Sequence, residues 1–595
     1  MGISLARNLA TFAAMLALLW PIKVLALDPK PARAPGTSLK EVLADYERYL
    51  KAVDPIAAGQ RGDLVALARW PDNSLTAVAE NLRLLQVMRT QLVALAEATL
   101  TDEEALNRDL LRERLEIELA GFSFDEERIP FNTGDGFFTV PNYAADGVVL
   151  RTEPQARAWI AKLAALPAYY ATETANMRRG LKSGLVRPRL VVERNTKALQ
   201  GRAAQPAERQ ALLKPLHALP ATMPAALRTS LQAEALELVK SKIQPAEKAL
   251  AEFFQNEYLP LAAVSIGIRE QPDGKAYYRY LIRRHTSTNL TPEEIHQIGL
   301  AEVARIRVEM LAVMTEIGFT GSITEFVAQL RTDKRFIAAS TDEYVEKVRD
   351  LAKRADAKLP AFFRTLPRLT YGVRVLAPEL KDSSSGYNPG SPEQGVAGFI
   401  LVNPGPIDQS PLYGMPAWAL HEGVPGHHLQ IALAQERADL PLFRRNSDIN
   451  AYVEGWALYS EHLGVEMGMY RTPYEHFGRL SLEIWRASRL VIDTGMHAMG
   501  WTREQAVAFL RENTALSELF LNYEVDRYIG WPAQALGYKL GEIRIRQLRA
   551  RAEKELGPSF DLRSFHDAIL LPGAMPLDLL ERQIDRWIKA SQRDG

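Results

Sequence analysis

Helix-start signals recur along almost the whole chain, and they constrain the fold more than any other feature. A Ser or Thr stands three residues before a Glu or Gln, directly ahead of an apolar-periodic run, at Ser38, Thr101, Thr152, Thr291 and Thr502. In this capping-box pattern the side chains satisfy backbone N–H groups that a first helical turn leaves free. Residues 75–119 also repeat apolar side chains at three- and four-residue steps. The sequence therefore predicts an all-α fold.

One stretch departs from the helical periodicity. In residues 366–404, Gly, Pro, Ser and Asn surround two short β-prone runs, 373–376 and 396–402. These runs predict a small β-sheet or hairpin. Because the sheet and the dense histidine motif both fall late in the chain, we divide it into an N-terminal helical half, 27–271, and a C-terminal helical half, 272–595.

The N-terminus predicts export. Residues 1–26 combine a basic residue, Arg7, a 12-residue apolar stretch and a small-residue end at Ala26, which is typical of a cleaved secretory signal. The apolar stretch is shorter than the ~20 residues that cross a membrane, although an uncleaved anchor is the alternative reading. We expect a periplasmic or extracellular protein that is not an integral membrane protein once processed. The oligomeric state is left open.

Charge and cysteine content narrow the chemistry. The 72 basic and 72 acidic residues cancel, so the chain lacks the basic excess of nucleic-acid-binding proteins, and we expect no nucleic-acid partner. The chain has no cysteine, so a metal site would need histidine and carboxylate ligands.

Three of the ten histidines lie within residues 421–428. A helical His-Glu-x-x-His motif places two imidazoles on one face to share a zinc ion, with the Glu directed at the bound water. Here His427 and His428 stand too far along the chain, and on an unbroken helix neither could chelate one ion with His421. Pro425 and Gly426 predict a break that brings a histidine back beside His421. We favour His427 over His428; the other reading is a helix end whose histidines cap carbonyl groups or face solvent.

A third ligand and a base complete the predicted site. Glu454 lies in an otherwise apolar helical stretch, where a lone carboxylate is costly unless partnered, and it stands at the distance along the chain at which gluzincin-type sites place their Glu ligand. Glu422 is the expected general base. Glu461 lies on the same helical face as Glu454 and either orients a ligand from behind or forms a surface ion pair.

The motifs resemble the bacterial domain-of-unknown-function 885 family, whose members are often exported. The resemblance rests on His421-Glu-Gly-Val-Pro-Gly-His-His-Leu-Gln430 and Glu454-Gly-Trp-Ala-Leu-Tyr459, and continues through residues 290–299, 491–497, 528–538 and 565–570. That family is similar in turn to helical zinc peptidases of the thimet-oligopeptidase and thermostable-carboxypeptidase kind, from which the longer His-to-His spacing departs. The resemblance implies a two-lobed helical fold with a metal at the floor of a central cleft, and hydrolysis of short peptides.

The resemblance also implies roles for single residues. Tyr538 occupies the place of the last tyrosine in the Gly-Tyr-rich motif of the oligopeptidases and would stabilise the oxyanion, with Tyr528 and His497 as weaker alternatives. Core packing is the competing reading for each. Residues 395–403 resemble the edge strand that binds extended substrates, or form a structural hairpin. A substrate carboxylate could bind Arg486, Arg489 or Arg544.

The sequence therefore predicts a Zn²⁺-dependent peptidase acting on short peptides. Water activated by the metal also hydrolyses other amides and esters, which is one alternative. A non-catalytic peptide-binding protein is the other, although binding alone would not need Glu422.

Overall fold

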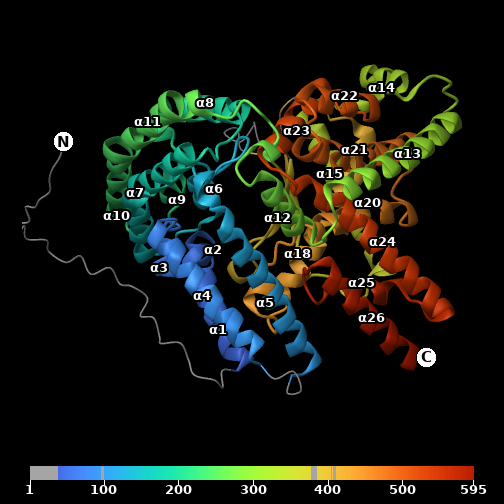
Figure 1. Ribbon diagram of the computed structural model, residues 1–595, viewed down its shortest axis with the longest axis horizontal. Coiled ribbons are helices and arrows are strands. Elements are labelled where there is room, and N and C mark those ends of the chain that lie inside the picture. The colour runs from blue at the N-terminus through green and yellow to red at the C-terminus, as the bar shows by residue number, and fades with distance from the viewer. Residues whose placement is uncertain (1–37, 96–99, 377–384, 404, 406–409, 595) are drawn as a thin grey trace, which may run out of the picture.

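The computed structural model describes residues 38–95, 100–376, 385–403, 405 and 410–594. The predicted signal segment, 1–26, lies outside them. The described chain is largely α-helical with one small sheet, as predicted. In Figure 1 the blue-to-green helices α1–α11 lie on the left and most of the yellow-to-red helices on the right, with α12 between them.

The N-terminal half is built from eleven α-helices among the described residues. They are α1 (Leu39–Val53), α2 (Pro55–Gln60), α3 (Leu64–Leu67), α4 (Leu75–Val93), α5 (Asp102–Gly121), α6 (Val140–Gly147), α7 (Glu153–Ser183), α8 (Arg189–Ala203), α9 (Lys214–His217), α10 (Ala225–Leu238) and α11 (Gln244–Phe253). Helices α1, α4 and α5 share a core that includes Val42, Leu85 and Leu111.

The second half contains the remaining helices. They are α12 (Gly274–Thr286), α13 (Pro292–Ile317), α14 (Ile323–Thr332), α15 (Thr341–Asp356), α16 (Leu359–Phe362), α17 (Met415–Glu422), α18 (His427–Glu436), α19 (Leu442–Arg445), α20 (Asn450–Glu466), α21 (Pro473–Ala498), α22 (Arg503–Asn513), α23 (Glu518–Gly530), α24 (Gly537–Leu556), α25 (Leu562–Leu570) and α26 (Leu577–Asp594). Helix α13 packs along α21, and α20 along α24.

The predicted helix starts are confirmed at atomic detail. All five capping boxes form: the Ser or Thr side chain accepts from the backbone three residues on, and the Glu or Gln side chain accepts from the cap residue. Helices α7 and α13 end at Gly184 and Gly318, whose left-handed backbones suit glycine.

The sheet has three strands in the order β1–β3–β2. Strand β1 (Tyr371–Val375) pairs parallel with β3 (Gly398–Val402), and β2 (Gly386–Asn388) pairs antiparallel with the other side of β3. The two β-prone runs therefore form strands as predicted, but the expectation of a substrate-binding edge in residues 395–403 is wrong. Strand β3 is central, and its backbone groups already pair on both sides.

The halves are joined by a shared core. The largest hydrophobic cluster combines side chains of α7, α8, α10 and α11 with Ile492 of α21, Leu510 of α22 and Val525 of α23. The proposed division at residue 271 therefore crosses one continuous core, and its place as a domain boundary stays a prediction.

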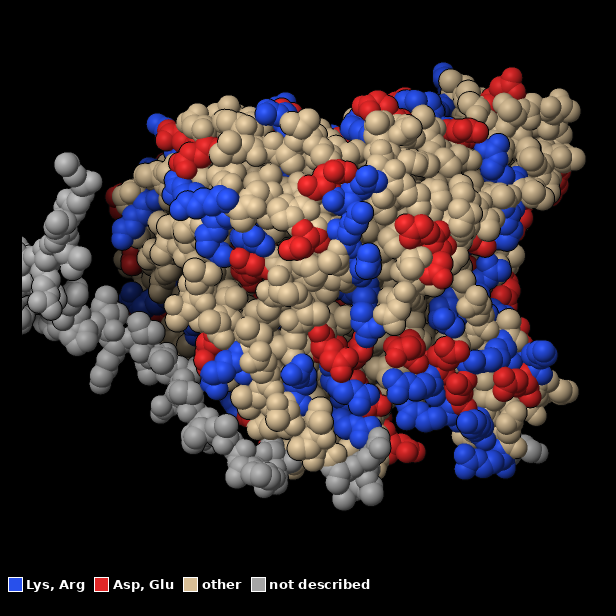
Figure 2. Space-filling model, in the orientation of Figure 1, with Lys and Arg blue, Asp and Glu red and all other residues tan. Residues whose placement is uncertain are grey.

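Two further observations concern the hydropathy of the helices and the charge of one face. Among the described residues, no helix combines the length and hydropathy that a bilayer crossing needs. Acidic and basic side chains are interspersed over the face drawn in Figure 2, in keeping with the zero formal charge of the chain.

Candidate metal centre

A break in the chain brings His427 back beside His421. Helix α17 ends at Glu422 and α18 begins at His427, with four residues between them. The turn is closed by the Gly426 N–H group, which donates to the Leu420 carbonyl (3.0 Å), and Trp456 Nε1 donates to the Pro425 carbonyl (2.8 Å). A Cβ atom at Gly426 would lie 2.0 Å from the His421 carbonyl oxygen, so only glycine fits.

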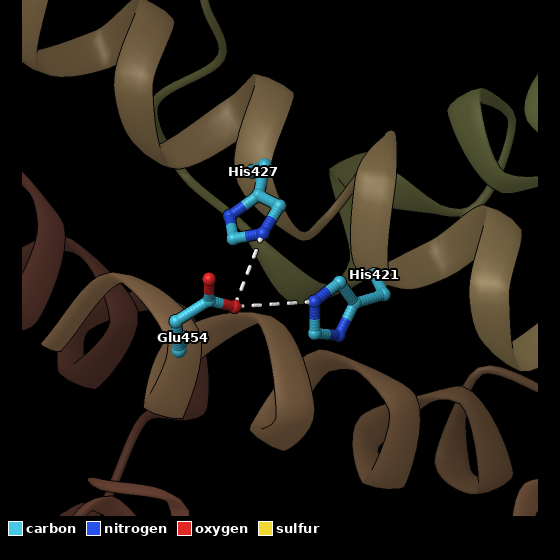
Figure 3. A group of neighbouring side chains, drawn as sticks. All are labelled: His421, His427 and Glu454. Carbon is cyan, nitrogen blue, oxygen red and sulfur yellow. Dashed lines mark ion pairs between the residues drawn. The ribbon is translucent and has the colours of Figure 1, made fainter. Parts of the chain in front are cut away.

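Glu454 faces both imidazoles from helix α20. Its Oε2 atom lies 3.4 Å from His421 Nε2 and 3.4 Å from His427 Nε2 (Figure 3). Ligands of tetrahedral zinc at ~2.1 Å stand about 3.4 Å apart, so these separations match the edges of one coordination tetrahedron. Glu454 Oε2 is also buried with no hydrogen-bond partner. The three residues therefore fit a divalent ion, and they are the one such group among the described residues.

The position of Glu454 depends on a close helix crossing. The next residue, Gly455, meets Gly541 of α24, and a Cβ atom at Gly455 would lie 2.5 Å from Gly541 Cα. A Cβ at Gly541 would lie 1.8 Å from the Ala451 carbonyl oxygen. The two glycines thus let α20 and α24 approach closely enough to place Glu454 and Tyr538 at one site.

The field at the site favours positive charge. Burial lowers the pKa of His421, but the neighbouring carboxylates of Glu454 and Glu461 outweigh it and raise that pKa to about 9. Burial would raise the pKa of Glu454, yet His427 and His421 hold it well below its usual range. A proton on His421 thus supplies the positive charge that the Glu454 and Glu461 carboxylates favour. A bound divalent cation would supply positive charge at the same place.

Glu422 shares this environment. Its side chain is 9% exposed, and burial raises the pKa of its carboxyl, helped by Glu454 and opposed by His421, His427 and Arg486. A carboxyl group with a raised pKa next to a metal site is suited to take up and release a proton.

His421 is held from behind by Glu461. Its Nδ1 atom lies 2.8 Å from Glu461 Oε1, which also lies 3.3 Å from Arg486 Nη2. Glu461 is 1% exposed, so it is not a surface ion pair. A carboxylate on the far nitrogen fixes the tautomer and ring orientation of a ligating histidine.

Tyr538 also reaches the centre. It is the second residue of α24, and its ring lies nearly parallel to that of His421, at 12° with centroids 6.4 Å apart. Burial, and then the Glu454 carboxylate, raise the pKa of its hydroxyl, which therefore stays protonated and able to donate.

The other three candidates lie elsewhere. His428 bonds the Tyr387 hydroxyl through Nδ1 (2.8 Å) and the Leu369 carbonyl through Nε2 (3.0 Å), so it links α18 to the sheet. His497 accepts from the Ile268 N–H group (3.3 Å) and donates to the Tyr528 carbonyl (3.0 Å). The Tyr528 hydroxyl accepts from Trp485 and Arg489. Both ring nitrogens of each histidine and this hydroxyl are thus used within the fold.

The arginines suggested for substrate binding are also engaged. Arg486 and Arg489 are 3% and 2% exposed and pair with Glu461 and Glu524, while Arg544 pairs with Glu581. Each already has a carboxylate partner, so none is free to bind a substrate carboxylate without giving up that partner.

A cleft of about 1150 Å³ leads to Glu454. Helices of both halves line it, with aromatic and charged side chains that include Tyr46, Glu113, Arg284, Asp448 and Trp531. The sequence reasoning did not assign a role to Asp448 or Trp531. The available signals were that Asp448 stands close to Glu454 in the chain and that Trp531 lies within the 528–538 motif.

The family described as "Bacterial protein of unknown function (DUF885)" matches residues 55–584. The chain belongs to the DUF885 family. That part of the sequence resemblance is confirmed, while the likeness to zinc peptidases stays a prediction. No curated protein matches this DUF885 member.

Two solved structures share the DUF885 fold seen here. A chain from Colwellia psychrerythraea is 28% identical, with a TM-score of 0.87 over 93% of this chain and 100% of its own. One from Shewanella oneidensis is 18% identical, with a TM-score of 0.67 over 92% of this chain and 99% of its own, and shows the fold alone. Each is described as a "putative lipoprotein".

Proposed function

We propose that this DUF885 protein is a zinc-dependent peptidase that hydrolyses short peptides. The observation that supports the proposal most is the convergence of His421, His427 and Glu454, with each imidazole nitrogen 3.4 Å from the carboxylate and with Glu422 directly after the first histidine. A purely structural metal site would be closed by a fourth protein ligand, whereas the described residues offer three here, which would leave a position for water.

The protein residues divide the chemistry between them. His421, His427 and Glu454 would hold the ion, which when bound makes water acidic and polarises a carbonyl group. Glu422 takes the proton of the attacking water and passes it to the departing amine. The Tyr538 hydroxyl donates to the oxygen that becomes negative. Glu461 keeps His421 in the tautomer that presents Nε2.

The cleft supports a peptide as substrate. Its volume of about 1150 Å³ exceeds the ~300–1,000 Å³ of ordinary small-molecule sites. Its lining mixes aromatic rings with both signs of charge, which suits a chain of varied side chains better than a uniform ligand. Other amides and esters remain as outcomes of the test.

We place the protein outside the cytoplasm. The signal-like residues 1–26 support this placement, and so does the 28% identical chain from Colwellia psychrerythraea, which is described as a "putative lipoprotein". Mass spectrometry of the mature chain from the native host should give an N-terminus at Leu27; an intact Met1 would contradict the cleavage.

The decisive experiment combines metal analysis with digestion of a peptide library by the full chain. Wild type and Glu422→Gln should each bind one zinc ion, but only wild type should cleave, because the variant cannot carry the proton. The matched control is Glu316→Gln, which changes an exposed carboxylate of α13 and should cleave like wild type.

Equal cleavage by Glu422→Gln and wild type would remove Glu422 from the mechanism. Wild type that cleaves without metal would end the zinc hypothesis. Cleavage of amide or ester libraries, with no peptide cleaved, would redirect the substrate class.

A further inference from the structure

Helix α21 contacts both Glu461 and Tyr538, the two residues that lie beside the His421 ring. Its Arg486 pairs with Glu461, the carboxylate behind His421, and places Cζ 4.3 Å from the centre of the Trp485 ring. Its Arg489 places Cζ 4.1 Å from the same ring and 4.2 Å from the Tyr538 ring. Tyr538 in turn lies parallel to His421. Three residues of α21, Arg486, Trp485 and Arg489, thus form a series of contacts. The series begins at Glu461, behind His421, and ends at Tyr538, whose ring is parallel to that of His421.

Arg489 is the member of this series that touches Tyr538. Its guanidinium is fixed by two bonds: Nε donates to the Tyr528 hydroxyl (2.7 Å), and Nη2 lies 3.1 Å from Glu524 Oε2. The Tyr528 hydroxyl also contacts Glu524. These buried partners hold the plane of the guanidinium in one orientation, which gives the Tyr538 ring a rigid, positively charged surface to lie on.

Arg489 has no direct route to a substrate. Its side chain is 2% exposed, and its guanidinium is enclosed by Trp485, Tyr528, Glu524 and Tyr538. Any effect on the reaction must therefore pass through a neighbour, and Tyr538 is the neighbour that also contacts the metal-binding histidine.

We infer that Arg489 is a positioning residue for Tyr538. This inference rests on the proposed function. By holding the Tyr538 ring against its guanidinium, it keeps the hydroxyl where the oxyanion forms. The interaction matters in the transition state, when the oxygen becomes negative, and not in substrate binding.

The kinetic test uses Arg489→Met, Tyr538→Phe and the double variant. Methionine keeps much of the length of arginine but has neither the positive charge nor the planar guanidinium group. Each single variant should lose kcat by about 10–100-fold, with KM within about threefold and zinc content unchanged. If Arg489 acts through Tyr538, the double variant should be no slower than Tyr538→Phe alone.

Affinity for a phosphinic peptide, whose tetrahedral anion mimics the transition state, should fall in parallel with kcat. Tyr528→Phe, which removes the hydroxyl that fixes Arg489, is a second route to the same loss and serves if Arg489→Met does not fold. Multiplicative losses in the double variant, or loss of zinc with loss of kcat, would overturn the inference.

A readout without turnover separates this inference from the proposed function. In the full chain carrying 3-fluorotyrosine at position 538, the ¹⁹F resonance should shift and broaden in Arg489→Met, because the ring loses its fixed neighbour. An unchanged resonance overturns the inference even if the enzyme is active. Wild type that neither binds zinc nor cleaves peptides overturns the proposed function instead, and with it the kinetic role of Arg489.

Discussion

Glu461 shows how one buried carboxylate can orient a proposed metal ligand, His421. It accepts from His421 Nδ1 and so leaves Nε2 facing Glu454. It also pairs with Arg486, and both side chains are almost completely buried. The orientation of the imidazole is therefore fixed before any ion arrives, which lowers the cost of binding one.

Replacing this carboxylate should weaken zinc binding without removing a ligand. We expect Glu461→Gln to raise the zinc dissociation constant about 10–100-fold, the range found for partners that orient ligating histidines. A competitive chelator titration measures it. Glu466→Gln is the matched control, since that residue lies on the same helix and pairs with Arg549 at the surface. Equal affinities in the two variants would mean that Glu461 does not orient His421.

At the scale of single residues, the sequence was informative where spacing and chemistry act together. His421, Glu422 and Glu454 could be selected because a histidine–glutamate pair followed by a carboxylate in an apolar helix has few other uses. Tyr528 and His497 were selected from motifs alone. A motif does not tell which atom faces the metal, and in the structure both face the interior of the fold.

At the scale of elements, the α17–α18 turn is the structure on which the site depends. Gly426 passes so close to the carbonyl groups of His421 and Leu420 that a Cβ atom would overlap both, at 2.0 and 2.4 Å. The turn must open to admit any side chain, and opening it moves His427 away from His421.

Gly426→Ala should therefore lower both stability and zinc affinity. We expect a loss of about 1–3 kcal/mol or more in the free energy of unfolding, the usual cost of forcing atoms into a packed site, measured by urea denaturation. Gly201→Ala in α8 is the control, because nothing lies within 4 Å of its added Cβ atom. If the two variants unfold alike and bind zinc alike, the turn is not what holds His427.

The same scale shows the limit of local patterns. Capping boxes predicted five helix starts correctly because a cap is decided by residues three apart. Strand β2 was missed, since three residues, Gly386–Asn388, are too short for an alternating pattern. The edge position assigned to residues 395–403 was wrong because β2, the strand that was missed, pairs with the side of β3 that β1 leaves open.

At the scale of the whole molecule, the cleft is lined by helices of both halves of the chain and leads to Glu454. Trp531 is 39% exposed and lines it, beside His285. A large apolar side chain exposed in a cleft favours contact with a bound ligand.

Trp531→Ala should accordingly raise KM for a cleaved peptide, by roughly tenfold (~1.4 kcal/mol), and leave kcat within about threefold. Steady-state kinetics on one library-derived peptide measure both. Leu519→Ala removes a side chain that is more exposed, at 66%, but lies outside the cleft lining, so it should behave like wild type. A loss confined to kcat would place Trp531 in the chemistry and contradict its role in binding.

The feature that could least be predicted from the sequence is the packing of the two halves around one shared core. Helical periodicity shows which face of each helix is buried but not what covers it. The cluster that unites α7–α11 with α21–α23 brings together residues hundreds of positions apart. Only the fold reveals that the cleft has walls from both halves.

Zinc stoichiometry in His427→Ala and His428→Ala tests the central claim most directly. The two histidines are adjacent in the chain, but Nε2 of one faces Glu454 while both nitrogens of the other are bound to the sheet and the segment before it. Wild type and His428→Ala should each hold one zinc ion per chain, and His427→Ala should bind it at least about 100-fold more weakly. A His427→Ala variant that binds zinc as tightly as wild type would contradict the account.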